Sequence, residues 1–213
     1  MTKLRFPFGL FPLVVGGVLL LAISLQAQNT VHYDAVPGGA KIKVDGTSTL
    51  HDWTVETQAV GGFMELDPAF DADLKTLNGT PKVEVTVPIR QMKNTEGKKS
   101  MDNVMYEHMN MKDNPIIKYH LVSLAAKPGA AQFDAKGELT VSGVTRTNTM
   151  PVTFERIDKS KIKVKGTTNF KMTDFGIKPP ALTVVGIGIK TGDDIKLAFE
   201  WTAAQPEKTA DAK

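Results

Sequence analysis

Apolar and polar residues alternate along six short stretches, and this period constrains the fold more than any other feature. The clearest stretch is 161–172, where Ile162, Val164 and Phe170 alternate with lysine, threonine and asparagine. A period of two places successive side chains on opposite faces of a β-strand, one buried and one facing water. The same period recurs in 41–46, 83–89, 133–141, 152–154 and 195–201. The pattern therefore predicts an all-β protein.

Short clusters of turn-forming residues separate these stretches. They include Gly61-Gly62, Asn78-Gly79 and Gly192-Asp193-Asp194. Such residues accept the backbone angles of tight turns, so we expect the strands to connect as hairpins or meanders. Their spacing predicts about eight or more antiparallel strands, a number that closes into a barrel and leaves no free sheet edge.

The segment from Glu96 to Asp113 breaks the alternation. Its apolar residues fall at helical spacing: Met101, Val104, Met105 and Met109. We therefore expect one short amphipathic helix between strands, ending before Asn114-Pro115. Because methionine adapts its shape, this face would suit a lid over an apolar cavity. It would equally suit ordinary packing of a helix on a sheet.

The N-terminal residues predict export. Lys3 and Arg5 precede an uncharged run from Phe6 to Leu25, and the small residue Ala27 follows. This is the pattern of a secretory signal peptide. We therefore expect a cleaved signal peptide over 1–27, a barrel domain over 28–201, and a polar, disordered tail over 202–213. The expected location is periplasmic or secreted, with an uncleaved membrane anchor as the alternative.

Charge and cysteine content exclude several functions. Removing Lys3 and Arg5 leaves 24 of the 26 basic residues against 23 acidic ones, so the net charge falls from +3 to +1. Such a balance indicates no nucleic-acid partner. The chain has no cysteine. Disulfides, a thiol nucleophile and a lipoprotein anchor are therefore excluded.

The sequence holds no motif typical of an enzyme. The four histidines lie far apart, at 32, 51, 108 and 120, so we expect no metal site. His51-Asp52 is the most suggestive pair, but neighbouring residues of a strand face opposite sides. Nucleophile-elbow, zinc-protease and phosphate-loop motifs are missing from the sequence. We expect no cofactor, and the enzymatic alternative is a lipid-acting enzyme that uses His51 or His120.

Four segments follow one another in a distinctive order. They read GTSTLHDWTV at 46–55, MDN at 101–103 with NPIIKY at 114–119, GELTVSGVTR at 137–146, and FKMTDFGI at 170–177. Together they resemble the YceI family of bacterial envelope proteins over about residues 30–201, and the third segment is the most specific. The resemblance implies an extended lipocalin-like antiparallel β-barrel that holds a long polyisoprenoid in its interior.

We therefore expect non-enzymatic binding or carriage of a long-chain isoprenoid or similar apolar lipid. A barrel of about eight strands leaves room for one ligand, and its inward positions here are apolar. The expected lining residues are Ile42, Val44, Val85, Val87, Met101, Met105, Met109, Leu139, Val141, Val164, Phe170, Met172 and Phe175. Two alternatives stay open: a core filled by its own side chains, and a ligand-free module that binds a protein through a sheet edge. The oligomeric state also stays open, a homodimer included.

Overall fold

The computed structural model describes residues 29–128, 131–184 and 186–207. Its strands are β1 (Val31–Ser48), β2 (Trp53–Thr57), β3 (Gly61–Leu66), β4 (Lys82–Pro88), β5 (Lys93–Asn94), β6 (Ile116–Ala126), β7 (Gln132–Val141), β8 (Val144–Asp158), β9 (Lys161–Lys171), β10 (Ala181–Val184) and β11 (Ile187–Ala204). Its helices are α1 (Pro68–Asp73) and α2 (Lys99–His108), with short 3-10 turns η1 (Ile89–Gln91) and η2 (Met172–Phe175).

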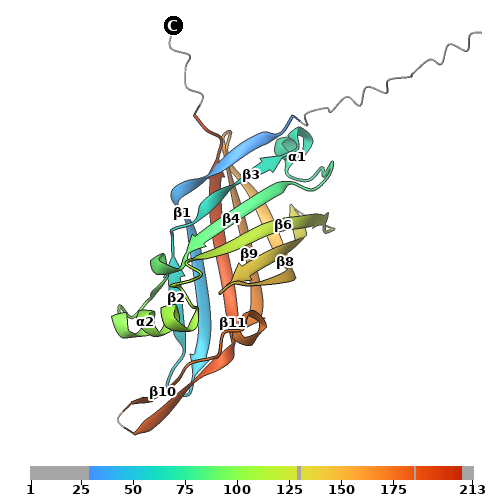
Figure 1. Ribbon diagram of the computed structural model, residues 1–213. Helices are drawn as coiled ribbons and strands as arrows, with labels where there is room; N and C mark the ends of the chain where they lie inside the picture. The colour runs from blue at the N-terminus through green and yellow to red at the C-terminus, as the bar shows by residue number, and fades with distance from the viewer. Residues whose placement is uncertain (1–28, 129–130, 185, 208–213) are drawn as a thin grey trace, which may run out of the picture.

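Eight of these strands close into an antiparallel barrel. The ring runs β1, β3, β4, β6, β7, β8, β9 and β11, and it closes because β11 pairs with β1 (Figure 1). Alternation determines which face is inward: on β9, Ile162 and Val164 are buried. Lys165 of the same strand faces outward and pairs with Glu155 of β8 at 2.9 Å. The predicted all-β barrel is confirmed.

The long strand β1 divides the barrel wall at one end. Its first residues pair with β3, whereas Ile42–Gly46 pair with β2 along the same edge. β2 pairs with β5 on its other edge, while β4 pairs with β3 and β6. The wall therefore separates into a β2–β5 side and a β4–β6 side, and α2 lies beside this division (Figure 1).

The opposite end is closed by α1. Phe70 of this helix meets Phe133 and Phe154 edge to face, with ring centroids 5.4 and 5.2 Å away. A polar network holds the helix: the Tyr33 hydroxyl donates to Asp71 Oδ1 at 2.6 Å, and Arg156 Nη2 lies 2.8 Å from the same carboxylate oxygen. Aromatic packing and a part-buried ion pair thus close this end of the barrel.

Three details differ from the sequence-based expectations. α2 occupies Lys99–His108, inside the wider segment that periodicity indicates. The structure adds α1, which is too short for a periodic signal, although Asp67 caps it by accepting from the Ala69 N–H at 2.9 Å. β11 extends to Ala204 because Ala203 is fully buried opposite Ile162, so the ordered chain passes the predicted boundary at Trp201.

The predicted signal peptide, 1–27, and the last tail residues, 208–213, lie outside the described residues. Within the part of the chain that the structure describes, neither helix has the length and apolar character needed to cross a bilayer.

Candidate functional site

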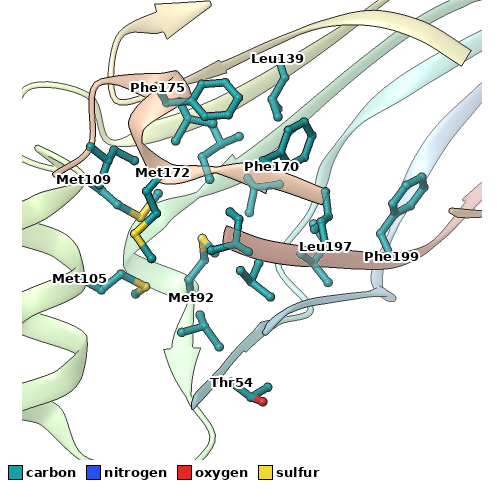
Figure 2. Close-up of a pocket in the computed structure, with 18 of the residues that line it drawn as sticks. Thr54, Met92, Met105, Met109, Leu139, Phe170, Met172, Phe175, Leu197 and Phe199 are labelled. Carbon is teal, nitrogen blue, oxygen red and sulfur yellow. The ribbon is translucent and has the colours of Figure 1, made fainter. Parts of the chain in front are cut away.

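An apolar cavity of about 710 Å³ occupies the barrel interior. Inward-facing side chains from most strands line it, and Figure 2 shows the region where Met105 and Met109 come from the helix side toward Met92 and Met172. Its volume falls within the range of small-molecule sites, about 300 to 1,000 Å³. The alternative of an interior filled by its own side chains therefore does not hold.

All thirteen residues expected to line the site face this cavity. Ile42 and Val44 lie on β1, Val85 and Val87 on β4, Met101 and Met105 on α2, Met109 just after it, Leu139 and Val141 on β7, Val164 and Phe170 on β9, and Met172 and Phe175 in η2. Their contact with a lipid stays a prediction.

Several residues that line the cavity are missing from the set predicted from the sequence. Leu197, Phe199 and Trp201 of β11 line the cavity, and the alternation over 195–201 could have identified them. Tyr119 and Met92 also line it, but no periodic signal distinguishes them from packed core residues. Tyr119 lies on β6 and Met92 lies between η1 and β5, so their place in the lining depends on how these segments pack around the interior.

Glycines in the wall make room for two aromatic rings of the lining. A Cβ atom at Gly166 would lie 2.6 Å from the Phe199 ring, and one at Gly137 would overlap the Tyr119 ring and hydroxyl. Both rings therefore lie against backbone that carries no side chain. This arrangement preserves open volume in the middle of the barrel.

The polar residues of the cavity gather at the end beneath α2. They include Ser48 at the end of β1, His51 from the link between β1 and β2, Asn94 from β5, and Asp102 and His108 from α2. The remainder of the wall is almost wholly apolar. The site therefore combines an apolar interior with a polar mouth, an arrangement that suits an amphiphile.

Of the two histidines that the enzymatic alternative names, His51 lines the cavity and lies 3.6 Å from Glu96 Oε1, whereas His120 does not line it. His51 Nδ1 lies 2.6 Å from the backbone oxygen of Asp52 rather than its carboxylate, because both residues are in a loop. His120 Nδ1 lies 2.7 Å from Glu84 Oε1 outside the cavity. Within the described residues, no group of three side chains could hold a metal ion.

A buried carboxylate ties α2 to β5. Asp102 Oδ1 accepts from the backbone N–H of Asn94 at 2.8 Å and from its side-chain amide at 2.6 Å. Lys93 Nζ lies 3.5 Å from the other oxygen. Burial disfavours the charged carboxylate, but these hydrogen bonds and the lysine charge outweigh burial, so the pKa of Asp102 is lowered. The ionised form therefore stabilises the folded state.

This lowered pKa makes part of the stability depend on pH. Because the folded pKa lies below the unfolded value of about 3.9, the stabilisation is complete above that pH and is lost as pH falls through the folded pKa. We expect Asp102→Asn to lower the free energy of unfolding at pH 7 by about 1 to 3 kcal/mol. The difference from wild type should narrow near pH 3, as measured by urea unfolding.

Glu107→Gln is the matched control, because Glu107 is exposed on the same helix. It should shift stability much less at either pH. An Asp102→Asn deficit that is equally large at both pH values would contradict a role for the ionised carboxylate.

The Tyr119 hydroxyl is buried in the cavity wall without a hydrogen-bond partner among the described residues. Burial raises the pKa of Tyr119 to about 12. Removing an unpaired hydroxyl sacrifices no hydrogen bond, so Tyr119→Phe should leave the free energy of unfolding unchanged or raise it by up to about 1 kcal/mol. Thermal unfolding of the lipid-free protein measures this change.

Tyr106→Phe provides the comparison, because the Tyr106 hydroxyl donates toward the carbonyl oxygens of Arg90 and Met92 at 2.9 and 3.0 Å. Tyr106→Phe should lower the free energy of unfolding by about 1 kcal/mol. Equal losses in the two variants would mean that the Tyr119 hydroxyl is bonded after all.

Comparisons with known proteins agree with this architecture. Residues 30–203 match the family model of the YceI-like domain. A UPF0312 protein of Pseudomonas putida (strain GB-1) is 26% identical over 153 residues, which are 67% of this chain and 78% of the relative. A UPF0312 protein of strain W619 matches to the same extent.

Two solved structures share the fold. Burkholderia cenocepacia BcnA has a TM-score of 0.65 and 16% identity, over 80% of this chain and 100% of that one. A polyisoprenoid binding domain from Saccharophagus degradans, implicated in plant cell wall breakdown, has a TM-score of 0.62 and 11% identity, over 83% and 99%. Identities this low establish similarity of fold alone.

Proposed function

The chain belongs to the YceI family, and on this premise we propose that it binds a long-chain isoprenoid or a similar apolar lipid inside the barrel without catalysing a reaction. The observation that carries the proposal is the open apolar cavity of about 710 Å³. The polyisoprenoid-binding domain of S. degradans, which shares the fold, is consistent with the same ligand class.

Hydrophobic burial alone is large enough for such binding. Each methylene transferred from water contributes about 0.8 kcal/mol, so ten would contribute about 8 kcal/mol before the costs of association. No ionic anchor is needed deep in the cavity. The polar groups beneath α2 would then face the polar end of the ligand.

The absence of catalysis is part of the proposal. His51 and His108 face the cavity mouth, but each has a ring nitrogen beside a backbone carbonyl, that of Asp52 and of Lys178. Among the residues that the structure describes, neither imidazole is hydrogen-bonded to a hydroxyl group, and the carboxylate nearest to His51 is that of Glu96, at 3.6 Å. A lipid-acting enzyme that uses His51 would lose activity in His51→Ala, whereas a binding protein should retain its ligand.

We also propose that the protein works outside the cytoplasm, in the periplasm or as a secreted protein, after cleavage following Ala27. The basis is the N-terminal pattern of Lys3, Arg5 and the uncharged run that follows. The mass of the protein recovered from the periplasm tests this location, because cleavage removes residues 1–27.

The deciding experiment is native purification followed by organic extraction and mass spectrometry of the extract. We expect a stoichiometric isoprenoid or related lipid. An empty protein that also fails to take up added isoprenoids would overturn the proposal and favour a ligand-free interaction module.

A further inference from the structure

We propose that α2 is a hinged lid, and that ligands enter and leave between its last turn and the segment 176–180. This inference rests on the proposed lipid binding and adds the route by which the lipid passes. The helix supplies Met101, Met105 and His108 to the cavity lining, so lifting it exposes the interior. Its attachments are unequal on its two sides.

The side facing β5 is held firmly. Asp102 is only 7% exposed and accepts two hydrogen bonds from Asn94. Asn94 in turn donates to the Lys98 carbonyl at 2.7 Å and accepts from the Lys98 N–H at 3.0 Å, at the start of the helix. Tyr106 adds hydrogen bonds to the chain just before β5. We call this side of α2, held by the contacts of Asp102, Lys98 and Tyr106, the fixed edge.

The opposite side is held by much less. His108 Nδ1 lies 2.7 Å from the Lys178 carbonyl oxygen, an exposed contact with the segment that leads into β10. Next to it, Met109 packs on a small cluster that contains Met172 and Phe175. Figure 2 shows the Met109 side chain directed toward Met172. We call these two attachments, the exposed hydrogen bond and the packing of Met109 on this cluster, the latch.

Two residues with left-handed backbone flank the helix. Gly97 has φ +70°, and no atom lies near the position that a Cβ would take there. Asn110 has φ 47° on the other side. Glycine and asparagine tolerate such angles and change them at low cost. They are suited to act as hinges, which are short segments that absorb backbone rotation when a lid moves.

The lid face is suited to repeated opening. Met105 and Met109 are partly buried against the two core clusters rather than fully enclosed by them. Unbranched methionine side chains repack readily against different shapes. The helix can thus separate from the cavity, or close over a lipid, without disturbing the buried aromatic rings at the far end.

A reversible bridge across the latch tests the route. His108→Cys with Lys178→Cys introduces the only two thiols into a cysteine-free chain, and a bismaleimide with a reducible spacer joins them after loading. The probe is all-trans-retinol, a fluorescent isoprenoid alcohol, and transfer to excess phospholipid vesicles reports its release. We expect bridging to slow release by about tenfold or more, because a lid that cannot open blocks exchange of the ligand, and we expect reductant to restore the rate.

Two further cysteine pairs serve as controls, each compared with and without its bridge. The bridged and reduced forms of Lys93→Cys with Tyr106→Cys, at the fixed edge, should release retinol at the same rate. So should those of Glu155→Cys with Lys165→Cys, whose native side chains form an ion pair on the outer wall at 2.9 Å. Slowing at the β5 edge but not at the latch would overturn the proposed route, and so would unchanged release from the bridged latch. If the unbridged protein takes up no retinol, the proposed function fails instead.

Discussion

Replacing Phe133 with alanine is expected to lower the free energy of unfolding by about 3 to 5 kcal/mol, the usual cost of truncating a buried phenylalanine. Phe133 is 1% exposed. Its ring meets those of Phe70 and Phe154 edge to face, at 5.4 and 5.5 Å. The substitution therefore removes one ring of the triangle that closes the barrel under α1 and leaves a void behind. Equilibrium urea unfolding measures the loss.

Phe63→Ala is the control with the same change of side chain. Phe63 lies on the outer face of β3, stacked on His32 at 5.4 Å with Lys82 over its ring. Its truncation should cost less than half as much, since little buried volume is lost. Equal losses in the two variants would mean that the aromatic triangle does not stabilise the closed end.

Leu197→Trp is expected to weaken lipid binding about tenfold while the barrel stays folded. Leu197 faces the cavity from β11 (Figure 2), opposite Val44 of β1. The indole would occupy space otherwise available to the ligand. Excluding about two methylenes, at about 0.8 kcal/mol each, corresponds to roughly a tenfold loss of affinity. Retinol titration measures the affinity, and circular dichroism checks the fold.

Lys196→Trp introduces the same side chain one position earlier. Successive strand residues face opposite sides, and Lys196 is exposed, so this variant should bind retinol as wild type does. If Leu197→Trp proves unstable, Leu197→Phe provides a smaller step with a graded loss. Full affinity in a folded Leu197→Trp protein would place the ligand outside the barrel.

The strands and their inward faces could be predicted from the amino-acid sequence. On β9 the inward positions Ile162 and Val164 and the outward position Lys165 follow directly from the period of two, and the structure places them so. The same logic indicated the inward side of the eight predicted lining residues that lie on strands, and all eight face the cavity. The period of two is a local property of the chain, so it indicates the inward face of a strand without any knowledge of the strands that pair with it.

The helices were harder to predict from the sequence than the strands. α1 is only six residues long, so hydrophobic periodicity could not reveal it, although Asp67 followed by Pro68 is a typical helix start. α2 was expected from its methionines. The unequal attachment of its two sides could not be predicted from the sequence. It depends on the hydrogen bond between Asp102 and Asn94, eight residues away on β5, and on the contact between His108 and Lys178, seventy residues away.

The amino-acid sequence alone determined the strand faces, the all-β class, the methionine-rich helix and the resemblance to the YceI family, because these depend on local order along the chain. Only the tertiary structure decided that the interior is open rather than filled. The open volume of a barrel depends on how side chains of different strands pack in its interior, as when the Tyr119 ring of β6 lies against Gly137 of the neighbouring strand β7. The position of the lid and its latch was decided in the same way, by contacts between segments that the sequence separates.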